Sequence, residues 1–261
     1  MVRLALLSIA ALAVSTPALA IGRFADIEVI DGSNGRVLPL YHHSGHYYVA
    51  GEPGQEYRVR IANHEPGRML AVASVDGINV ISGETASPDQ TGYILDAYEG
   101  YDILGWRKSL DHVASFYFTR LPDSYAARTG RAQDVGVIGV ALFREKAAPP
   151  AIGMIEDRAA GMPAQPPTAA APPTAPATQA ALARDAASAM EKAENRLGTG
   201  HGRSQDSSVV NADFDRASTT PGEIVAIYYD SRSNLVARGI IPGPDGNHRP
   251  NPFPNGFVPD P

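Results

Sequence analysis

The sequence predicts a mainly β protein whose first folded part is an antiparallel β-sandwich, and three observations support this fold class. Short apolar or alternating segments recur at regular spacing through residues 24–146, with Gly, Asp and Asn turns between them. Glu56–Asn63 alternates between apolar and polar side chains, as expected for an antiparallel strand with one wet face. Asp76-Gly77 supplies the two positive φ angles that a two-residue type I′ hairpin requires. We expect these strands to form a self-sufficient two-layer body.

The other strands of this first part follow in chain order. Val135–Phe143 is apolar on both faces, so we expect it in the centre of a sheet. Residues 121–131 are expected to form a loop with one helical turn near Ser124–Arg128. The remaining expected strands are Asp26–Ile30, Val37–Tyr41, His46–Ala50, Gly92–Leu95, Tyr101–Trp106 and Val113–Thr119.

The hairpin at Asp76-Gly77 sets its own register. Val75 then faces Ile78, and Ser74 faces Asn79, because residues opposite each other share one face of a sheet. The tip is polar on one face, which indicates a strand pair whose end lies in solvent. We interpret Asp76 and Asn79 as residues of the turn alone.

Residues 1–20 have the pattern of a signal peptide. Arg3 gives a positive start, Leu4–Val14 an apolar run, and Ala18-Leu19-Ala20 a small-x-small cleavage site. The apolar run is shorter than the ~20 residues that a membrane span requires. The chain has no cysteine, so neither a lipid-modified cysteine nor a disulfide is expected. The sequence therefore predicts an exported, periplasmic or secreted protein whose stability depends on its hydrophobic core.

The charge balance argues against nucleic acid as a partner. The formal net charge is −6, and removal of the signal peptide takes away Arg3 as well. Lys and Arg are scattered without a basic run, whereas nucleic-acid binders normally present a basic face. No second long apolar segment follows the signal, so we expect no transmembrane segment in the mature chain. Nothing in the sequence indicates a cofactor.

The composition changes abruptly after residue 146. Pro, Ala and Thr dominate residues 147–179, which predicts a disordered linker that acts as a tether or spacer. Residues 180–241 are expected to form a helix-plus-hairpin segment, and the Pro- and Gly-rich residues 242–261 a disordered tail. This segment is small for a core of its own, so we expect it to pack against the first part or to pair with another copy.

The second segment carries fewer clear signals. Ala180–Arg196 has apolar residues at helical spacing, with Gly198 as the expected stop. Leu197–Gln205 is polar and rich in glycine, which we interpret as a flexible hinge. The expected strands are Ser207–Asp213, Glu223–Asp230 and Leu235–Ile241, the last two pairing as a hairpin.

Five stretches of sequence span both predicted folded parts and skip the linker and the tail. They read SVDGINVISGE, GWRKS, LPDSYAARTGR, VGVIGVALF and YDSRSNLVARGII. Together they resemble a group of exported bacterial proteins of unassigned function. This resemblance implies export and a two-part layout, and it transfers no catalytic residue to this chain.

A histidine cluster is the candidate metal site. His42, His43 and His46 form H-H-x-x-H, and neutral imidazole is a common ligand for divalent metals. The pattern differs from H-E-x-x-H, because it has no glutamate base and lies in a predicted turn. The alternative interpretation is a solvated turn with no metal.

The best candidate for a ligand-binding surface lies around the only tryptophan. Trp106 precedes Arg107 and Lys108, so an aromatic face for a sugar or peptide lies beside cations for an acidic partner. Tyr93 and Tyr101 come shortly before them and extend this predicted surface. The alternative is a tryptophan packed inside the sandwich.

Carboxylates on the loop after the hairpin are a further candidate. Glu84 and Asp89 lie on this loop, and Asp96, Glu99 and Asp102 follow it. Two carboxylates across a cleft can hydrolyse glycosides, although exposed loop carboxylates are the ordinary case. The sequence therefore favours a non-catalytic binding or structural module with a protein or glycan partner in the cell envelope. The alternative is a hydrolase or metal-binding protein that uses the histidine cluster or these carboxylates.

Overall fold

A computed structural model describes residues 20–147 and 196–243 of the chain. Almost all of the predicted signal peptide and linker, the predicted helix at 180–196 except Arg196, and most of the predicted tail lie outside the described residues. None of the helices in the described part has the length and apolarity that a bilayer crossing requires.

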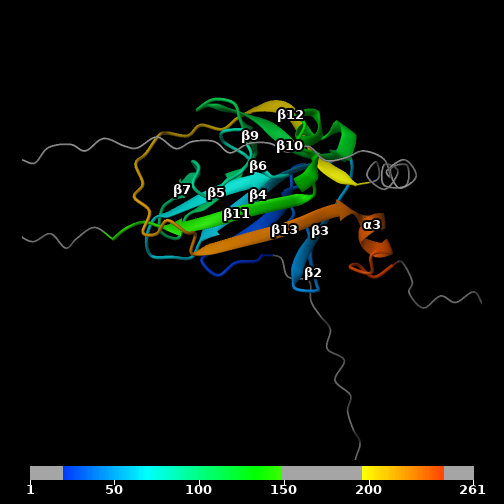
Figure 1. Cartoon of the computed structure of the whole chain (residues 1–261), viewed down its shortest axis with the longest axis horizontal. Helices are drawn as coiled ribbons and strands as arrows, with labels where there is room; N and C mark the ends of the chain where they lie inside the picture. The colour runs from blue at the N-terminus through cyan, green and yellow to red at the C-terminus, as the bar shows by residue number, and fades with distance from the viewer. Residues whose placement is uncertain (1–19, 148–195, 244–261) are drawn as a thin grey trace, which may run out of the picture.

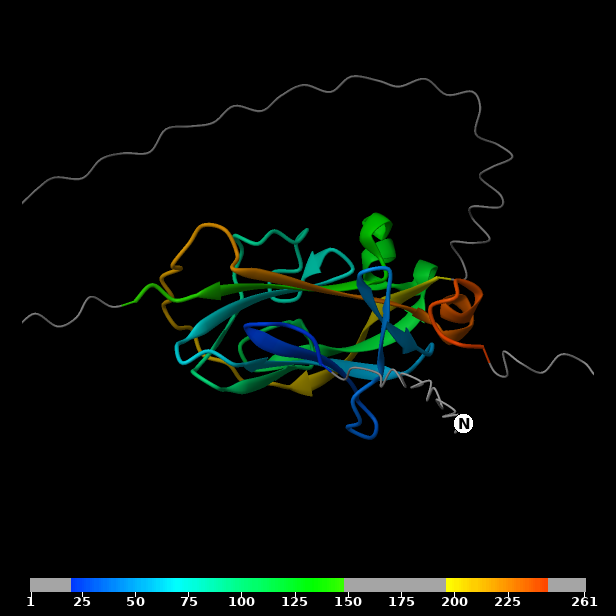
Figure 2. The same cartoon turned by 90° about the horizontal axis from the view of Figure 1, so that it is seen from below.

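The described chain forms two β-sheets that pack face to face (Figures 1 and 2), which confirms the predicted mainly β sandwich. The six-stranded sheet has the order β1-β4-β10-β12, with β8 beside β4 and β9 beside β10. Its strands are β1 (Ala25–Asp31), β4 (Glu56–Asn63), β8 (Gly100–Ile103), β9 (Gly105–Arg107), β10 (His112–Arg120) and β12 (Leu197–Asp206).

The seven-stranded sheet has the order β2-β3-β13-β11-β5-β6, with β7 beside β5. All of its pairs are antiparallel except the parallel pair of β13 and β3. Its strands are β2 (Leu40–His43), β3 (His46–Gly51), β5 (Met69–Val75), β6 (Ile78–Asn79), β7 (Tyr93–Leu95), β11 (Val137–Arg144) and β13 (Glu223–Ser231).

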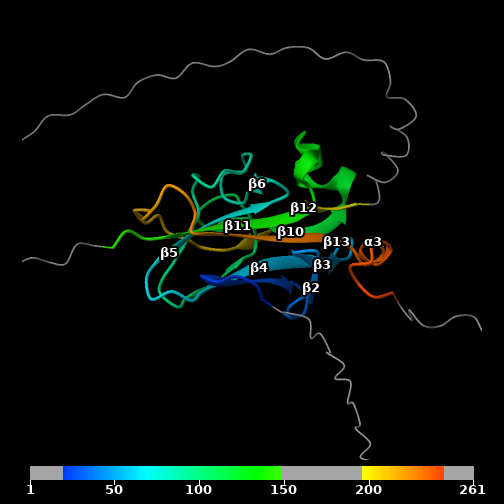
Figure 3. The ribbon, with the colours of Figure 1, turned by 60° about the horizontal axis from the view of Figure 1, so that its bottom comes forward.

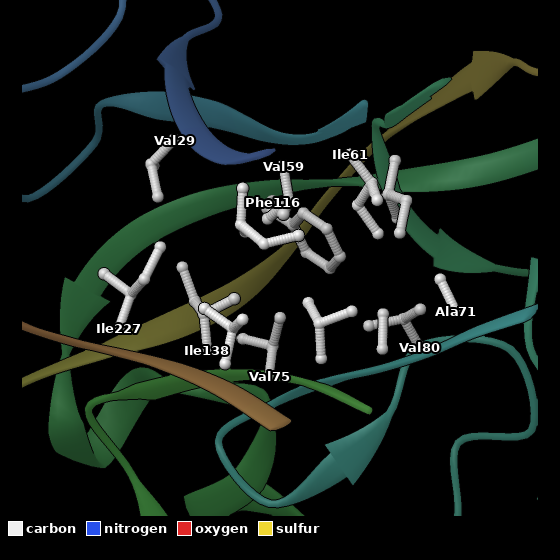
Figure 4. Packing of buried hydrophobic residues seen from close by; sticks show 14 of the residues in the cluster. Val29, Val59, Ile61, Ala71, Val75, Val80, Phe116, Ile138 and Ile227 are labelled. Carbon is white, nitrogen blue, oxygen red and sulfur yellow. The ribbon is translucent and has the colours of Figure 1, made fainter. Parts of the chain in front are cut away.

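The hydrophobic core lies between the two sheets. Figure 4 shows Val59 and Phe116 of the six-stranded sheet facing Ile138 and Ile227 of the other. All four are almost fully buried, and burial of one such side chain stabilises a fold by ~1.5–3 kcal/mol. The inward positions alternate along β4 as predicted, because every second side chain of a strand points to the same face.

Short helical elements close one end of the sandwich. They are η1 (Leu121–Asp123), α1 (Tyr125–Arg128), η2 (Ala132–Asp134) and α3 (Arg232–Ala237). The Ser124 side chain caps α1 by accepting a hydrogen bond from the Ala127 N–H, which confirms the predicted helical turn.

The predicted turn and register of the hairpin are confirmed, but the tip does not lie in solvent as predicted, because Asp76 and Asn79 are buried. Asp76 has φ +52° and Gly77 φ +70°, and the register pairs Val75 with Ile78 and Ser74 with Asn79. The strand predicted at residues 135–143 is also central, since β11 lies between β13 and β5.

The second segment does not form a separate unit. β12 extends the six-stranded sheet beside β10, and β13 lies between β3 and β11 in the other sheet (Figure 3). Without β13, the hairpin of β2 and β3 has no neighbouring strand in its sheet. Both segments therefore supply strands to both layers of one core, so residues 24–146, expected to form a self-sufficient body, share that core with the second segment.

Three element predictions in the second segment are wrong. Leu197–Gln205 belongs to strand β12, and its glycines allow close packing: a Cβ on Gly200 would lie 2.1 Å from the Tyr117 ring. Residues 207–213 form no helix or strand. The predicted strand at residues 235–241 overlaps α3, because the Ser231 side chain accepts a hydrogen bond from Asn234 N–H and caps a helix.

Candidate functional site

Trp106 is a core residue, which corrects the expectation of an exposed aromatic face. Only 4% of it is exposed, and its Nε1–H donates to the Gly200 carbonyl at 3.1 Å. Its ring packs edge-on against Phe116, with centroids 5.2 Å apart, and at a tilt against Tyr125, with centroids 4.9 Å apart. Trp106 therefore has no free face for a sugar or a peptide.

Arg107 is a structural link between segments. Its guanidinium donates to the Tyr93 hydroxyl at 3.1 Å, to the Ser207 hydroxyl at 3.0 Å and to the Ser207 carbonyl. Tyr93 is buried, and its ring lies 5.0 Å from that of half-buried Tyr101. The predicted aromatic and cationic surface is thus largely internal, and Lys108 is its one exposed member.

The loop carboxylates bond within their own loop. Glu84 accepts a hydrogen bond from Gln90 at 3.4 Å, and Asp89 accepts one from the Ser87 hydroxyl. That hydroxyl bond lowers the pKa of the Asp89 carboxyl, which keeps this exposed group ionised. Both residues help to shape the loop, and the lowered pKa of Asp89 is the opposite of what a general acid requires.

The three histidines are divided between the two faces of the β2–β3 hairpin. The His42 ring lies 5.1 Å from Tyr47, while His46 packs edge-on against Tyr228 at 5.3 Å. His43 is opposite His46, on the other face from His42. In the described ranges, no group of three or more His, Cys, Asp or Glu residues is placed to hold a metal ion.

Asp76 has a role that the sequence interpretation missed. It is 1% exposed, and its carboxylate joins three segments. Oδ1 accepts from the Gly136 N–H at 2.9 Å and from the Tyr229 hydroxyl at 2.5 Å, and Oδ2 accepts from the Thr199 N–H at 2.8 Å. Asp76 thus links the hairpin to β12 and β13, and is more than a turn residue.

A chain of hydroxyl groups ends at this carboxylate. The Thr199 hydroxyl lies 2.8 Å from that of Tyr229 and 2.6 Å from that of Tyr57. Because Tyr229 gives its one proton to Asp76, Thr199 must donate to Tyr229 and Tyr57 must donate to Thr199. With the Asp76 carboxylate ionised, each of the three hydroxyl groups therefore has an acceptor for its proton.

The electrostatics of this network follow from its burial. Desolvation raises the pKa of Asp76 from 3.8 to about 6, against the lowering effect of the hydrogen bonds that it accepts. Burial and the nearby Asp76 charge likewise raise the pKa of Tyr57 and Tyr229 well above 10. Asp76 is the only one of the three whose charge changes near neutral pH.

Asn79 organises the loop that follows the hairpin. Its fully buried side chain accepts from the Ile81 and Ser82 N–H groups at 2.8 and 3.1 Å. It donates to Gln90 Oε1 at 3.2 Å and to the Thr91 carbonyl at 3.1 Å. One side chain therefore connects the start and the end of residues 80–92, which we call the pinned loop.

Two arginines brace the pinned loop from outside. Arg131 donates to the Gly83 carbonyl at 2.9 Å, and Arg216 donates to the carbonyls of Pro88 and Gln90 at 2.9 and 2.6 Å. These bonds hold the loop in one shape before any ligand arrives.

Beside the pinned loop, the outer face of the seven-stranded sheet carries a row of small residues across three strands. Ser74, Gly139 and Ala226 are direct cross-strand neighbours on β5, β11 and β13. A Cβ on Gly139 would lie 2.8 Å from the Ser74 hydroxyl oxygen, so the row has no room for larger side chains there. On β13, Ile224 lies on one side of the row and Tyr228 on the other.

We call this feature the outer groove, with Ser74, Gly139 and Ala226 as its floor and Ile224 and Tyr228 as its walls. Ile224 is 63% exposed and Tyr228 36% exposed, which is unusual for large apolar side chains in the middle of a sheet. A cavity of about 150 Å³ lies where the groove meets the pinned loop, lined in part by Ser87 and Pro88.

The outer groove offers apolar contact and very few polar groups. The polar side-chain groups that line its cavity are the hydroxyls of Ser74 and Ser87. The backbone groups of the floor already form hydrogen bonds between neighbouring strands. Such a surface has room for an apolar group and few hydrogen bonds to offer a polar one. No protein-family model, no curated protein and no solved structure matches this chain.

Proposed function

We propose that this protein is an exported binding module that recognises a protein partner through the outer groove. The observation that carries the proposal is the exposure of Ile224 and Tyr228 on either side of a floor of small residues. Exposed apolar patches of this kind mark interaction sites on soluble proteins. Tyrosine also suits such a site, since it combines a large apolar ring with a polar end.

The pinned loop supports the proposal because it is already ordered. Binding costs less when the recognition surface does not lose conformational freedom on contact. Asn79, Arg131 and Arg216 together make seven hydrogen bonds to the loop, which leaves it little freedom to lose.

The chemistry of the groove favours a polypeptide over a glycan. Sugars present many hydroxyl groups and require several hydrogen-bonding side chains, whereas this cavity presents two serines. Ile224 and Tyr228 are four residues apart on one strand, so their Cα atoms are separated by ~13 Å. That width accommodates one extended segment with an apolar side chain directed at the floor.

Export is part of the same proposal. The signal-like residues 1–20, the absence of cysteine and the Pro- and Ala-rich stretch after residue 146 all suit a module that works outside the cytoplasm. The alternative, a hydrolase or a metal-binding protein, gains no support from the described residues. The histidines there are divided between two faces, and the loop carboxylates bond locally.

Site-specific crosslinking tests the proposal. A photoreactive phenylalanine analogue at Ile224 should capture a protein from an envelope fraction, while the same group at Val210 should not. Val210 is the matched control because it is 88% exposed and apolar but lies outside the groove.

The captured protein then allows a quantitative test. Ile224→Ser should weaken binding of the purified partner about 30-fold, since loss of one apolar anchor costs ~2 kcal/mol. Val210→Ser should leave the dissociation constant unchanged. Equal capture at both positions, or capture of glycan alone, would overturn the proposal.

A further inference from the structure

A second cleft, of about 360 Å³, lies at the end of β13 near α3. Its walls include Tyr48 of β3, Tyr228 and Asp230 of β13, and Arg238 just after α3. Tyr228 also forms a wall of the outer groove, so the cleft and the groove are adjacent. This cleft is polar, unlike the groove.

The Asp230 carboxylate is buried in this cleft with its two oxygens in different environments. The residue is 7% exposed. Oδ1 accepts from the Ser231 N–H and from Asn234 Nδ2, both at 2.8 Å. Oδ2 has an ion-pair contact with Arg238 at 3.9 Å, which is too long for a hydrogen bond. A carboxylate oxygen that lacks a close cation gains a charge-assisted hydrogen bond when a cation approaches it more closely.

Arg238 is a loosely held cation at this position. Its side chain is 53% exposed, and its guanidinium lies 5.4 Å from the centroid of the Tyr48 ring. A carboxylate beside an aromatic face is the arrangement that recognises guanidinium and ammonium groups. Arg238 therefore stands where a cationic group from outside would bind.

The opposite wall fixes the charge of the cleft. Arg196 donates to the Val135 carbonyl at 2.7 Å, and Asp134 lies on the same wall. The formal charges of the four charged residues that line the cleft sum to zero while Arg238 points into it; these residues are Asp134, Arg196, Asp230 and Arg238. When Arg238 moves out, the lining carries one net negative charge and accepts a cation in its place.

We propose that this cleft binds a guanidinium or primary ammonium group in competition with Arg238. The cation site is argued from Asp230, Tyr48 and Arg238 and from the charges of the cleft lining, without use of the outer groove. We assign the bound cation to a Lys or Arg side chain of the same protein partner. This assignment rests on the proposed function, because Tyr228 lines both the cleft and the outer groove and so places the two sites side by side.

The test uses n-butylguanidinium with the full mature chain, followed by NMR titration. Arg238→Gln removes the resident cation, so the variant should bind the probe at least fivefold more tightly than the wild type. Asp230→Asn, which is isosteric, should lose binding. The neutral analogue n-butylurea should not bind either protein. Arg232→Gln, which replaces an exposed arginine at the start of α3, is the matched control and should behave as wild type.

Arg238→Gln decides the matter even if Asp230→Asn fails to fold, because a half-exposed arginine can be replaced without loss of the core. Equal affinity of wild type and Arg238→Gln, or equal binding of n-butylurea, would overturn the inference. Ile224→Ser should not alter binding of the probe, so a failure of the outer groove and a failure of this cleft are distinguishable.

Discussion

Replacement of Asp76 by asparagine tests the buried network through the pH dependence of stability. Burial raises the pKa of Asp76 from 3.8 to about 6 in the folded protein. The folded state therefore binds a proton more tightly than the unfolded chain, and this contribution is complete below pH 3.8. It is lost as the pH rises through 6. A difference of about 2.2 pKa units corresponds to ~3 kcal/mol of unfolding free energy in total, of which ~2.4 kcal/mol is lost between pH 4 and 7.

Other titratable groups change the unfolding free energy with pH in the opposite direction. The pH dependence of the wild type must therefore be compared with that of Asp76→Asn. Burial, with the charges of Lys108 and Arg128, lowers the pKa of His201, and its contribution is lost as the pH falls through its folded pKa. Hydrogen bonds from Arg203 lower the pKa of Glu56, which acts in the same direction at lower pH. Both effects are common to the wild type and Asp76→Asn, and they cancel in the difference.

The measurement is urea unfolding of both proteins at pH values from 4 to 7.5. Asp76→Asn places an amide N–H against donors of Gly136, Thr199 or Tyr229, which lowers stability by a pH-independent amount. The difference in unfolding free energy between wild type and Asp76→Asn should therefore shrink by ~2.4 kcal/mol from pH 4 to pH 7. Parallel curves over this range would refute the assigned burial and pKa of Asp76.

Three further predictions concern the core, the pinned loop and the shared sheets. Trp106→Ala should destabilise the protein by ~3–5 kcal/mol in urea unfolding because it empties a buried site, and a change below ~0.5 kcal/mol would show that the ring is exposed. Asn79→Ala should cost ~2–3 kcal/mol and make residues 80–92 the first site of limited proteolysis; resistance equal to wild type would contradict its role as the hub of the loop. Residues 20–147 alone should show no dispersed NMR spectrum, and co-expression of residues 196–243 should restore it; a folded first fragment would disprove the need for β12 and β13.

Local patterns predicted the parts of the fold that depend on neighbouring residues. The alternation of Glu56–Asn63 and the turn at Asp76-Gly77 are set by sterics and by which face meets the core, so both could be read directly. The central position of β11 followed from its two apolar faces.

The sequence of the second segment predicts the wrong element where one residue type occurs in two kinds of local structure. Gly200 and Gly202 suggest flexibility, yet here they make room on a strand for the Tyr117 ring and for Ser115, respectively. Ser231 suggests a hairpin turn, yet it caps α3. The choice depends on what packs against these residues, and that information lies far away in the chain.

The candidate site shows the same limit. Asp76 resembles any turn aspartate because its partners Thr199 and Tyr229 lie 123 and 153 residues away. Trp106 and Arg107 suggested a surface because neighbouring residues cannot show that Gly200 and Ser207 cover them. Ile224 and Tyr228 form a surface only because β13 lies between β11 and β3, and no local pattern predicts that position.

The place of β13 also determines when folding can finish. Tyr47 of β3 pairs with Ile227 of β13, so the closing contact of the seven-stranded sheet joins residues 180 positions apart. Pairs this remote form late, because a long loop must close before they gain any stabilisation. If such a chain crossed a membrane pore from its amino end, it would stay unfolded until nearly its whole length had passed through. It would then complete its two sheets on the far side.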